Sequence, residues 1–314
     1  MGRNNTDKSL QQTKQPLAQR VKKEVQRSWP MYVMLLPAII LALIFCYAPM
    51  GGLVMAFQNY KPWLGITGSE FVGLDNFKQI FEFKESYQAI INTFIIAVSK
   101  MVLGLIFPII VALLLNEVHN MGVKKGIQTL VYLPHFLSWV TVAGMLRDIL
   151  GMDGIVNMFL QKVFGMDPIF FLGNAGMFRQ IVVISDLWKG FGFGMIVYLA
   201  AISNIDQSLY EAAQIDGASS IQQFRYITVP QVSPTTFFLA IMGIIGSFKV
   251  FDMISVLTAG GPGNSTSVMA YYIYKTAFTD FKMGYACALA WVLFLLIFAV
   301  TLVQWKFQDR FANE

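Results

Sequence analysis

Residues 204–230 read NIDQSLYEAAQIDGASSIQQFRYITVP, a polar stretch that separates two long apolar runs. Ser208 precedes Glu211 by three positions, which is the spacing of a capping box, so a short helix is predicted to begin at about Ser208. The two alanines after Glu211 leave one face of this helix nearly free of side chains, and a slim helix can enter a groove on a partner. Gly217 then permits a close approach or a sharp turn. An ordinary surface helix would carry the same cap, so the cap alone does not specify a function.

The composition of the rest of the chain indicates a membrane protein. Hydrophobic residues make up 56% of the 314 residues and charged residues 13%, against about 25% charged in ordinary soluble domains. A soluble protein with so few charges would lack the polar surface that it needs. Cys46 and Cys287 lie in apolar runs, where they are expected to act as small hydrophobic side chains rather than as a disulfide.

Six apolar runs are long enough to cross a hydrocarbon core about 30 Å thick, which takes roughly 20 helical residues. They are Met31–Phe57, Tyr87–Asn116, Leu130–Leu150, Phe178–Ile202, Pro234–Val256 and Gly284–Lys306. The sequence therefore predicts an all-α, polytopic membrane protein with six transmembrane helices.

Lys and Arg residues in the connections predict the orientation. If the N-terminus is cytoplasmic, the cytoplasmic segments hold twelve Lys and Arg residues and the outside segments hold six. The positive-inside rule favours this arrangement, which places both termini and the 204–230 stretch in the cytoplasm. The net charge of +5 is therefore interpreted as a topology signal and not as a sign of nucleic-acid binding.

The chain is predicted to consist of a basic cytoplasmic tail, residues 1–28, and a six-span domain, residues 29–314. Four apolar residues recur at every fourth position near the junction: Leu17, Val21, Val25 and Trp29. This pattern suits an amphipathic helix on the cytoplasmic leaflet, with Trp29 at the interface. A disordered basic tail that only satisfies the topology rule is an equally open interpretation.

The 204–230 stretch resembles the EAA motif of bacterial ABC importer permeases, which reads Glu-Ala-Ala, three residues, Gly, nine residues, Ile, one residue, a hydrophobic residue and Pro. The matching positions are Glu211, Ala212, Ala213, Gly217, Ile227, Val229 and Pro230. Val229 departs mildly, because the family usually has Leu there. Phe71–Phe77 is similar to the first outside loop of the family. Three further stretches are similar to its carbohydrate branch, in particular to the oligosaccharide and polysaccharide permeases: Leu257–Pro262, Tyr272-x-Tyr274 and Gly284-Tyr285-x-x-Ala288.

This resemblance implies a maltose-type ABC importer permease fold and a transport role without enzymatic activity. In the family the EAA helix docks into a cleft of an ATPase, and ATP-driven closure of two ATPases moves the permease between inward-open and outward-open states. The implied ATPase-coupling residues here are Glu211, Ala212, Ala213, Asp216 and Gly217. The chain has no G-x-x-x-x-G-K-[ST] sequence, so ATP and Mg²⁺ are expected on the partner. The implied partners are a second homologous permease, two ATPase subunits and an extracellular solute-binding protein.

Five ionisable residues at membrane depth are candidate functional residues, because a charge there is costly. They are Lys100, Asp186, Lys189, Lys249 and Asp252. Asp186 and Lys189 stand three apart and should share a helical face, and Lys249 and Asp252 repeat this spacing. Each pair is interpreted either as a cargo contact or as a structural ion pair. Lys100 is assigned no role.

In the resembling sugar permeases, the stretches that match Trp188–Phe193 and Ser247–Asp252 line a binding site in the middle of the membrane. The implied substrate-binding residues are Trp188, Lys189, Gly190, Phe193, Ser247, Lys249, Val250 and Asp252. The amide side chains that are familiar in the second stretch are absent here. Lys189 and Lys249 would suit an oligosaccharide with uronate, sialic acid or sulfate groups. Packing of the aromatic residues against lipid or neighbouring helices is the alternative.

Two other functional classes are considered. An ion-coupled secondary transporter would account for six spans and buried charges, but it does not explain the Glu-Ala-Ala stretch, and no inverted repeat is evident. A membrane-embedded enzyme would need a convergent carboxylate or metal constellation. His119 and His135 are far apart and have no ligand partner at metal-binding spacing, so no metal site and no catalytic residue are predicted.

Overall fold

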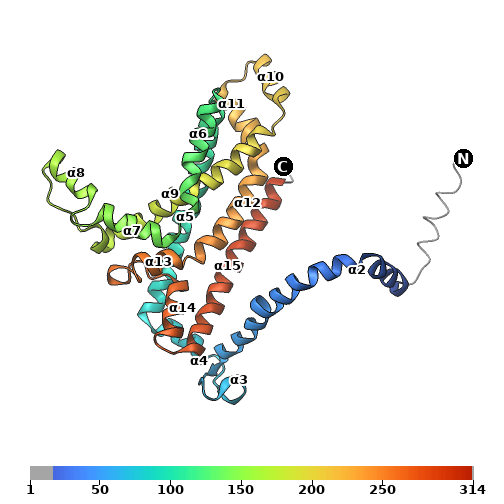
Figure 1. Cartoon of the computed structure of the whole chain (residues 1–314), viewed down its shortest axis with the longest axis vertical. Helices are drawn as coiled ribbons and strands as arrows, with labels where there is room; N and C mark the ends of the chain where they lie inside the picture. Colours follow the sequence, from blue (N-terminus) through green and yellow to red (C-terminus); the bar gives the residue numbers. More distant parts are fainter. Residues whose placement is uncertain (1–16, 313–314) are drawn as a thin grey trace, which may run out of the picture. The chain divides into compact units, whose positions relative to one another are not determined.

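The computed structural model describes residues 17–312, and nearly all of them lie in helices or in the turns between helices (Figure 1). The exception is a pair of two-residue strands, β1 (Gln58–Asn59) and β2 (Glu70–Phe71), which run antiparallel. The all-α fold class predicted from the sequence is therefore confirmed.

The first of two compact units, residues 1–54, is described from residue 17 onward. Its helix α2 (Leu17–Ala42) continues into the π-helix η1 (Leu43–Tyr47) and the 3-10 helix η2 (Ala48–Phe57), whose last residues belong to the second unit. The first expected span is thus helical throughout. The part of the basic tail from residue 17 onward is also helical, within α2. The tail before residue 17 lies outside the described residues, and the placement of a helix on the membrane surface stays a prediction.

The second unit, residues 55–314, holds the remaining helices. In chain order they are α3 (Gly65–Gly68), α4 (Asp75–Glu82), α5 (Lys84–Asn116), α6 (Met121–Tyr132), η3 (Leu133–Phe136), α7 (Trp139–Leu150), α8 (Ile155–Phe164), η4 (Phe171–Gly173), α9 (Ala175–Ser203), α10 (Gln207–Ile215), α11 (Ser220–Gln223), η5 (Phe224–Thr228), α12 (Val229–Phe248), α13 (Asp252–Leu257), η6 (Pro262–Asn264), α14 (Met269–Phe278) and α15 (Met283–Ala312).

Among the described residues, five helices are long and apolar enough to cross a membrane, and a sixth span results if one bent pair counts as a single span. That pair, Met121–Phe136 and Trp139–Phe164, is bent by 101°. The third expected span, Leu130–Leu150, is therefore not one straight helix. The cause is local: Pro134 opens η3, and Ser138 adopts an extended backbone and caps α7 with its side chain.

The fifth expected span is interrupted as well. α12 ends at Phe248 and α13 begins at Asp252, with non-helical backbone between them. The break lets Phe248 pack into the hydrophobic cluster with α15 while Met253 packs into a different cluster with α7 and α9. Lys249 and Asp252 therefore do not share a helical face, and that expectation is wrong.

The long helices of the second unit pack closely. α9 packs along α5, and α12 packs against both of them and against α15 (Figure 1). Small residues are buried at these crossings, among them Ala97 and Ala112 on α5 and Ala288 on α15. A Cβ on Gly192 of α9 would lie only 2.4 Å from the carbonyl oxygen of Val131 on α6. Without a hydrophobic driving force between helices in lipid, such close backbone approach is what holds spans together.

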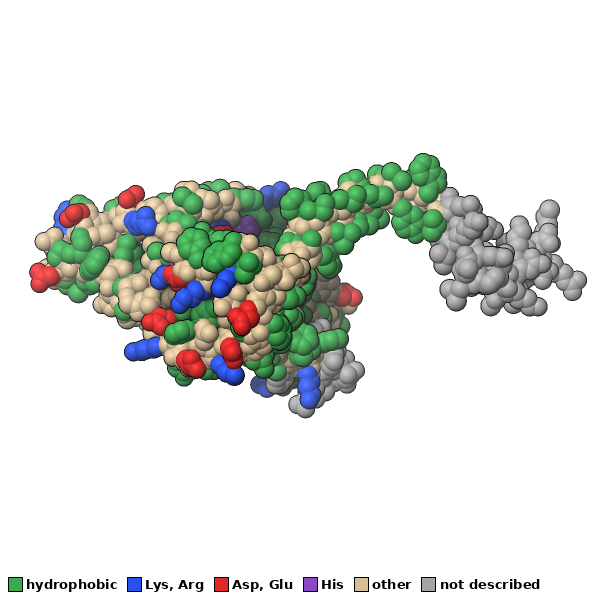
Figure 2. All heavy atoms as spheres, turned by 90° about the horizontal axis from the view of Figure 1, so that it is seen from below, with side chains coloured by type: hydrophobic (Ala, Val, Ile, Leu, Met, Phe, Trp, Pro, Cys, Tyr) green, Lys and Arg blue, Asp and Glu red, His purple; other side chains and the backbone are tan. Residues whose placement is uncertain are grey.

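Charged side chains gather at one end of the second unit. Figure 2 looks onto the end that carries α3 and α4 and shows Lys, Arg, Asp and Glu side chains intermixed on it. One exposed ion pair there joins Lys78 Nζ to Asp75 Oδ1 at 2.8 Å. This end is the one that the Lys and Arg distribution predicts to lie outside the cell.

Candidate functional site

The helix predicted around Glu211 is present as α10, but a different residue caps it. The carboxylate of Asp206 accepts a hydrogen bond of 3.0 Å from the backbone N–H of Ser208. The predicted capping box of Ser208 and Glu211 is therefore wrong, because Asp206 already occupies the N-cap position. Hydrogen bonds from the backbone and the side chain of Ser208 lower the pKa of Asp206. Glu211 lies inside the helix, so capping does not account for its presence.

The C-terminus of α10 is closed by a Schellman motif centred on Gly217. The N–H of Ala218 donates to the carbonyl of Ala213 at 2.9 Å, and the N–H of Gly217 donates to the carbonyl of Gln214 at 3.0 Å. Gly217 has a φ of +77°, which strains any residue with a Cβ. A Cβ at this position would meet no atom within 4 Å, so the backbone angle, and not lack of space, requires glycine here.

The predicted coupling residues are available to a partner. Glu211, Ala212, Asp216 and Gly217 are exposed, and Ala213 is half-buried. They lie at the end of the second unit that is formed by α10 and α11 (Figure 1).

Large apolar side chains are also exposed beside these residues. Ile215 is 87% exposed at the end of α10, and Ile221 is 77% exposed on α11. Ile215 lies in polar connecting sequence, and Ile221 lies in the short α11 before the apolar part of α12. Exposed apolar side chains beside a polar helix are typical of a protein interaction surface.

The coupling segment is tied to a transmembrane helix. The hydroxyl groups of Tyr210 on α10 and Thr228 are 2.8 Å apart, and Thr228 directly precedes α12. A capping box between Ser219 and Gln222 fixes the intervening α11. Because α11, η5 and α12 follow one another without a loop, a displacement of α10 would be carried through the Tyr210–Thr228 contact into α12.

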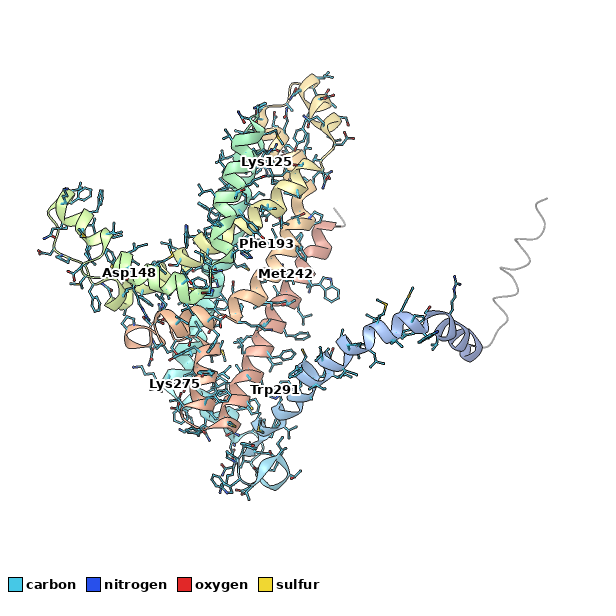
Figure 3. The ribbon with its side chains drawn as sticks, viewed as in Figure 1. Lys125, Asp148, Phe193, Met242, Lys275 and Trp291 are labelled. Carbon is cyan, nitrogen blue, oxygen red and sulfur yellow. The ribbon has the colours of Figure 1, made fainter. Side chains whose placement is uncertain are left out.

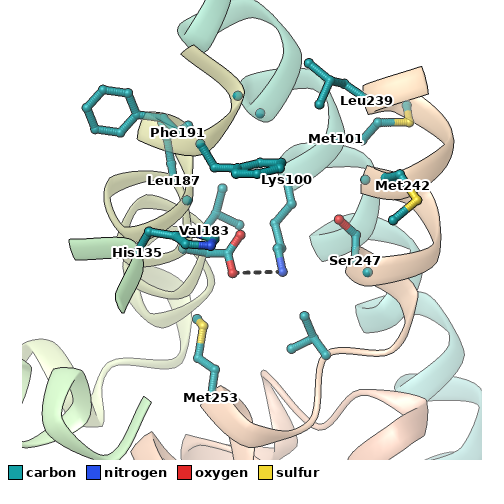
Figure 4. A pocket seen from close by; sticks show the side chains of 18 of the residues that line it. Lys100, Met101, His135, Val183, Leu187, Phe191, Leu239, Met242, Ser247 and Met253 are labelled. Carbon is teal, nitrogen blue, oxygen red and sulfur yellow. Dashed lines mark ion pairs between the residues drawn. The ribbon is translucent and has the colours of Figure 1, made fainter. Parts of the chain in front are cut away.

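α12 leads to a cavity of about 490 Å³ in the middle of the second unit. Figure 3 places Phe193 of α9 and Met242 of α12, which both line it, between Lys125 near one end of the unit and Lys275 near the other. The remaining wall comes from α5, η3, α7, α13 and the break before α13 (Figure 4). Its polar and charged lining residues are Lys100, His135, Asp186, Ser247, Lys249 and Asp252.

Six of the eight predicted substrate-binding residues line this cavity. They are Gly190, Phe193, Ser247, Lys249, Val250 and Asp252. The other two do not line it. Trp188 is 41% exposed on α9. The ammonium of Lys189 donates a 3.0 Å hydrogen bond to the carbonyl of His135 and lies 5.5 Å from the ring centroid of Trp139, so it stands behind two lining residues.

The charges pair differently from the expectation. Asp186 Oδ1 lies 3.0 Å from Lys100 Nζ of α5, so the structural ion pair with Lys189, one of the two interpretations, is not formed. The two ion pairs that join described residues are this one and the exposed pair on α4, so Lys249 and Asp252 do not form a pair either. The partner of Asp186 comes from a neighbouring helix because the α5 and α9 backbones lie side by side at this depth.

Aromatic rings form one wall of the cavity. The rings of His135 and Phe193 stack with centroids 5.4 Å apart and an interplanar angle of 16°, and the ring of Tyr132 also stacks with His135. Flat aromatic faces beside a few convergent polar groups are the usual composition of a small-molecule site.

Lys100 has no predicted role, and Asp186 is a candidate functional residue that is not among the eight predicted substrate-binding residues. One signal could have found them: the residues one helical turn before and after Lys100 are Ile96, Ala97, Leu103 and Gly104, none of which can neutralise it. A lysine in the middle of a membrane helix without a partner on its own helix must find one on another helix.

Known proteins resemble this chain over most of its length. Residues 104–312 match the family model described as "Binding-protein-dependent transport system inner membrane component". The polygalacturonan/rhamnogalacturonan transport system permease protein YteP of Bacillus subtilis (strain 168) is 36% identical over 85% of this chain and 83% of its own length.

Two solved structures are similar in both sequence and fold. A chain of a bacterial ABC transporter involved in the import of the acidic polysaccharide alginate is 37% identical, with a TM-score of 0.83, over 93% of this chain and 99% of that chain. A chain of the bacterial alginate ABC transporter in complex with an alginate pentasaccharide-bound periplasmic protein is 36% identical, with a TM-score of 0.80, over 91% of this chain and 96% of that chain.

Proposed function

We propose, from the premise that this chain belongs to the family of binding-protein-dependent transport system inner membrane components, that it is a permease subunit through which an ATP-driven ABC importer takes up oligosaccharides. The observation that carries the coupling mechanism is the exposed α10, which is followed by the turn at Gly217 and contacts the residue before α12 through the hydroxyl groups of Tyr210 and Thr228. It docks into a separate ATPase, which binds ATP and Mg²⁺.

The coupling works through a short mechanical path. Closure of two ATPases around ATP displaces α10, the hydroxyl contact between Tyr210 and Thr228 transmits the displacement to α12, and α12 changes the shape of the cavity that it lines. Repeated ATP binding and hydrolysis make the cavity open alternately to the two sides of the membrane. Glu211 and the exposed Ile215 form part of the docking surface.

The importer contains further subunits. A second, homologous permease completes the translocation path, two ATPases lie on the cytoplasmic side, and an extracellular solute-binding protein delivers the cargo. The binding-protein-dependent family and the similarity to the alginate transporter in complex with its periplasmic protein support a binding-protein partner. Both termini lie in the cytoplasm of a bacterial cell, on the same side as α10, in agreement with the excess of Lys and Arg in those segments.

The cargo is an acidic oligosaccharide. The aromatic wall at Phe193 offers a stacking surface, and Lys249 offers a cation inside the cavity. The similarity to permeases named for polygalacturonan and alginate transport supports this class of cargo. An ion-coupled secondary transporter is not favoured, because it would not need the exposed α10 and would not explain why the chain belongs to a binding-protein-dependent family.

Reversal of the charge at Glu211 tests the coupling. The Glu211→Arg variant is co-expressed with the candidate ATPase, and the amount of ATPase that co-purifies from membranes is measured. The matched control is Glu117→Arg, which changes an exposed carboxylate at the end of α5. We expect Glu211→Arg to lose the ATPase while Glu117→Arg keeps it, at equal membrane abundance. Equal retention by both variants contradicts docking through α10.

A further inference from the structure

Lys100 stands in the middle of α5 and directs its ammonium group into the cavity. Its ion pair with Asp186 of α9, at 3.0 Å, is marked by the dashed line in Figure 4. The Lys100 side chain is only 7% exposed and that of Asp186 is 28% exposed. The pair is therefore removed from bulk water but still opens on one side to whatever fills the cavity.

Stability alone does not explain this pair. Two charges that leave water lose more solvation energy than their attraction returns unless the geometry is excellent, and apolar residues of similar volume are often as stable. Apolar side chains, Met101 and Leu187 among them, line the same cavity, so an apolar pair would fit the surroundings. A charged pair at membrane depth that gains little stability indicates a role in transport.

The pair also has unused hydrogen-bonding capacity. An ammonium group has three N–H donors and a carboxylate has two acceptor oxygens. Within residues 17–312, the contact between Lys100 Nζ and Asp186 Oδ1 is the one polar contact of either side chain. Ser247, which is 8% exposed, presents its hydroxyl to the same cavity from α12 (Figure 4). The remaining donors of Lys100 are therefore positioned to contact a cargo molecule.

The charges around the cavity favour an anion. Lysines at positions 100 and 249 line it, and Lys189 is bonded to the carbonyl of a lining residue. Lys100 and Lys249 balance the two lining aspartates, Asp186 and Asp252, so the excess of one positive charge comes from Lys189 behind the cavity wall. A cargo with one acidic group in the cavity would neutralise this excess, and in a medium of low dielectric constant such compensation is strongly favoured.

We propose that Lys100 is a specificity-determining residue that donates hydrogen bonds to a carboxylate of the cargo, and that Asp186 is the positioning residue that holds the Lys100 ammonium at the cavity wall. This inference rests on the proposed uptake of an acidic oligosaccharide. When no cargo is bound, the carboxylate of Asp186 neutralises the ammonium of Lys100. When cargo is bound, its carboxylate accepts a second hydrogen bond from the same ammonium, and the pair with Asp186 stays together.

Uptake of two matched probes tests the role of Lys100. The complete importer is reconstituted in proteoliposomes, and ATP-dependent uptake is measured for trigalacturonic acid and for its uncharged methyl ester. For Lys100→Gln we expect uptake efficiency for the acid to fall about tenfold or more, the scale of one hydrogen bond to a charged group, with a much smaller change for the ester. Lys84→Gln, an exposed lysine at the start of the same helix, is the control and should change neither.

The unpaired aspartate left by Lys100→Gln can impair folding, so a double variant accompanies it. Lys100→Gln combined with Asp186→Asn removes both charges and should restore membrane abundance while the acid stays poorly transported. Equal losses for acid and ester in the double variant, at normal abundance, would show that the pair is structural and would overturn the proposal. Unchanged uptake of the acid would overturn it as well.

Asp186 is tested through a different readout. Asp186→Asn should raise the KM for the acid more than it lowers the maximal rate, because the ammonium remains but is held less firmly. Asp186→Glu should recover most of the wild-type KM. Loss of maximal rate with an unchanged KM contradicts positioning.

The same assay separates failure of this inference from failure of the proposed function. If the unsubstituted importer takes up the acid with ATP and the Lys100 variants take it up equally well, only the role of Lys100 is wrong. If the unsubstituted importer takes up the ester and not the acid, the acidic cargo is wrong and the role of Lys100 with it.

Discussion

The guanidinium of Arg179 donates a hydrogen bond of 2.7 Å to Oδ1 of Asn92, so that α9 is joined to α5 near one end of the bundle. The same guanidinium donates through Nε to the carbonyl of Ser265 at 3.0 Å. Asn92 in turn donates to the carbonyls of Asn264 and Ser267 at 2.8 and 3.1 Å. Two side chains thus fix the connection that leads from α13, which lines the cavity, to α14.

Replacement of Asn92 by leucine should destabilise this connection. Asn92 is fully buried, and its loss would leave two carbonyl groups and the Arg179 guanidinium with fewer partners. The expected loss is about 1–3 kcal/mol for each buried group left unsatisfied. The apparent melting temperature of the purified protein in detergent would report it. Gln180→Leu, at an exposed position on α9, is the control and should change the melting temperature little.

Gly217 is expected to tolerate asparagine better than valine. Its φ of +77° costs a residue with a Cβ roughly 1–2 kcal/mol, and asparagine adopts this region more readily than a β-branched residue. Gly217→Val should disrupt the end of α10 and lower ATPase co-purification and uptake, at unchanged membrane abundance. Gly217→Asn should keep more of both. If the two variants were equally impaired, the contact of the partner with the glycine surface, and not the backbone angle, would be decisive.

Gly192 should not accept even a methyl group. The Cβ of alanine would lie 2.4 Å from the carbonyl oxygen of Val131 and 2.9 Å from the Cα of Tyr132, so α9 and α6 would have to move apart. Overpacking of this kind costs about 1–3 kcal/mol. The test is the thermal stability of Gly192→Ala compared with Gly126→Ala on α6, where a Cβ meets nothing within 4 Å. A stable Gly192→Ala variant would contradict the close packing of these helices.

The cap at Asp206 should depend on pH. Because hydrogen bonds from Ser208 lower the pKa of Asp206 in the folded protein, the stabilising contribution of the cap is complete above the ordinary carboxyl pKa and is lost as the pH falls through the lowered value. Hydrogen exchange of the α10 amides, corrected for the intrinsic rate, should rise in this acidic range. Asp206→Asn retains an uncharged cap and should remove the pH dependence. Persistence of the dependence in that variant would assign it to another group.

Composition and the pattern of apolar runs were sufficient to predict a helical membrane protein. Apolar runs of about 20 residues predict spans because a helix must satisfy its own backbone in lipid, and this depends on length and hydrophobicity alone. The position of a short exposed helix around Glu211 was also predictable from the sequence. Its cap was assigned to the wrong residue, because two acceptors stood near the start and only the backbone geometry selects Asp206.

Breaks in the spans were harder to predict from the sequence. Pro134 indicates the bend before α7, but prolines inside α2 and α5 leave those helices continuous, so a proline alone does not predict a break. The interruption after Phe248 has no proline to signal it. It arises because residues on the two sides of the break are buried in different hydrophobic clusters, a choice made by the surrounding helices.

The sequence by itself determined a helical membrane protein with an exposed segment of the EAA type, because these features depend on local pattern. Only the tertiary structure decided which charges meet. Asp186 has Lys189 one turn away on its own helix, yet it pairs with Lys100, which is 86 positions earlier in the chain. The reason is that the close packing of α5 and α9 brings the Lys100 ammonium to 3.0 Å from Asp186, while Lys189 is directed to the carbonyl of His135.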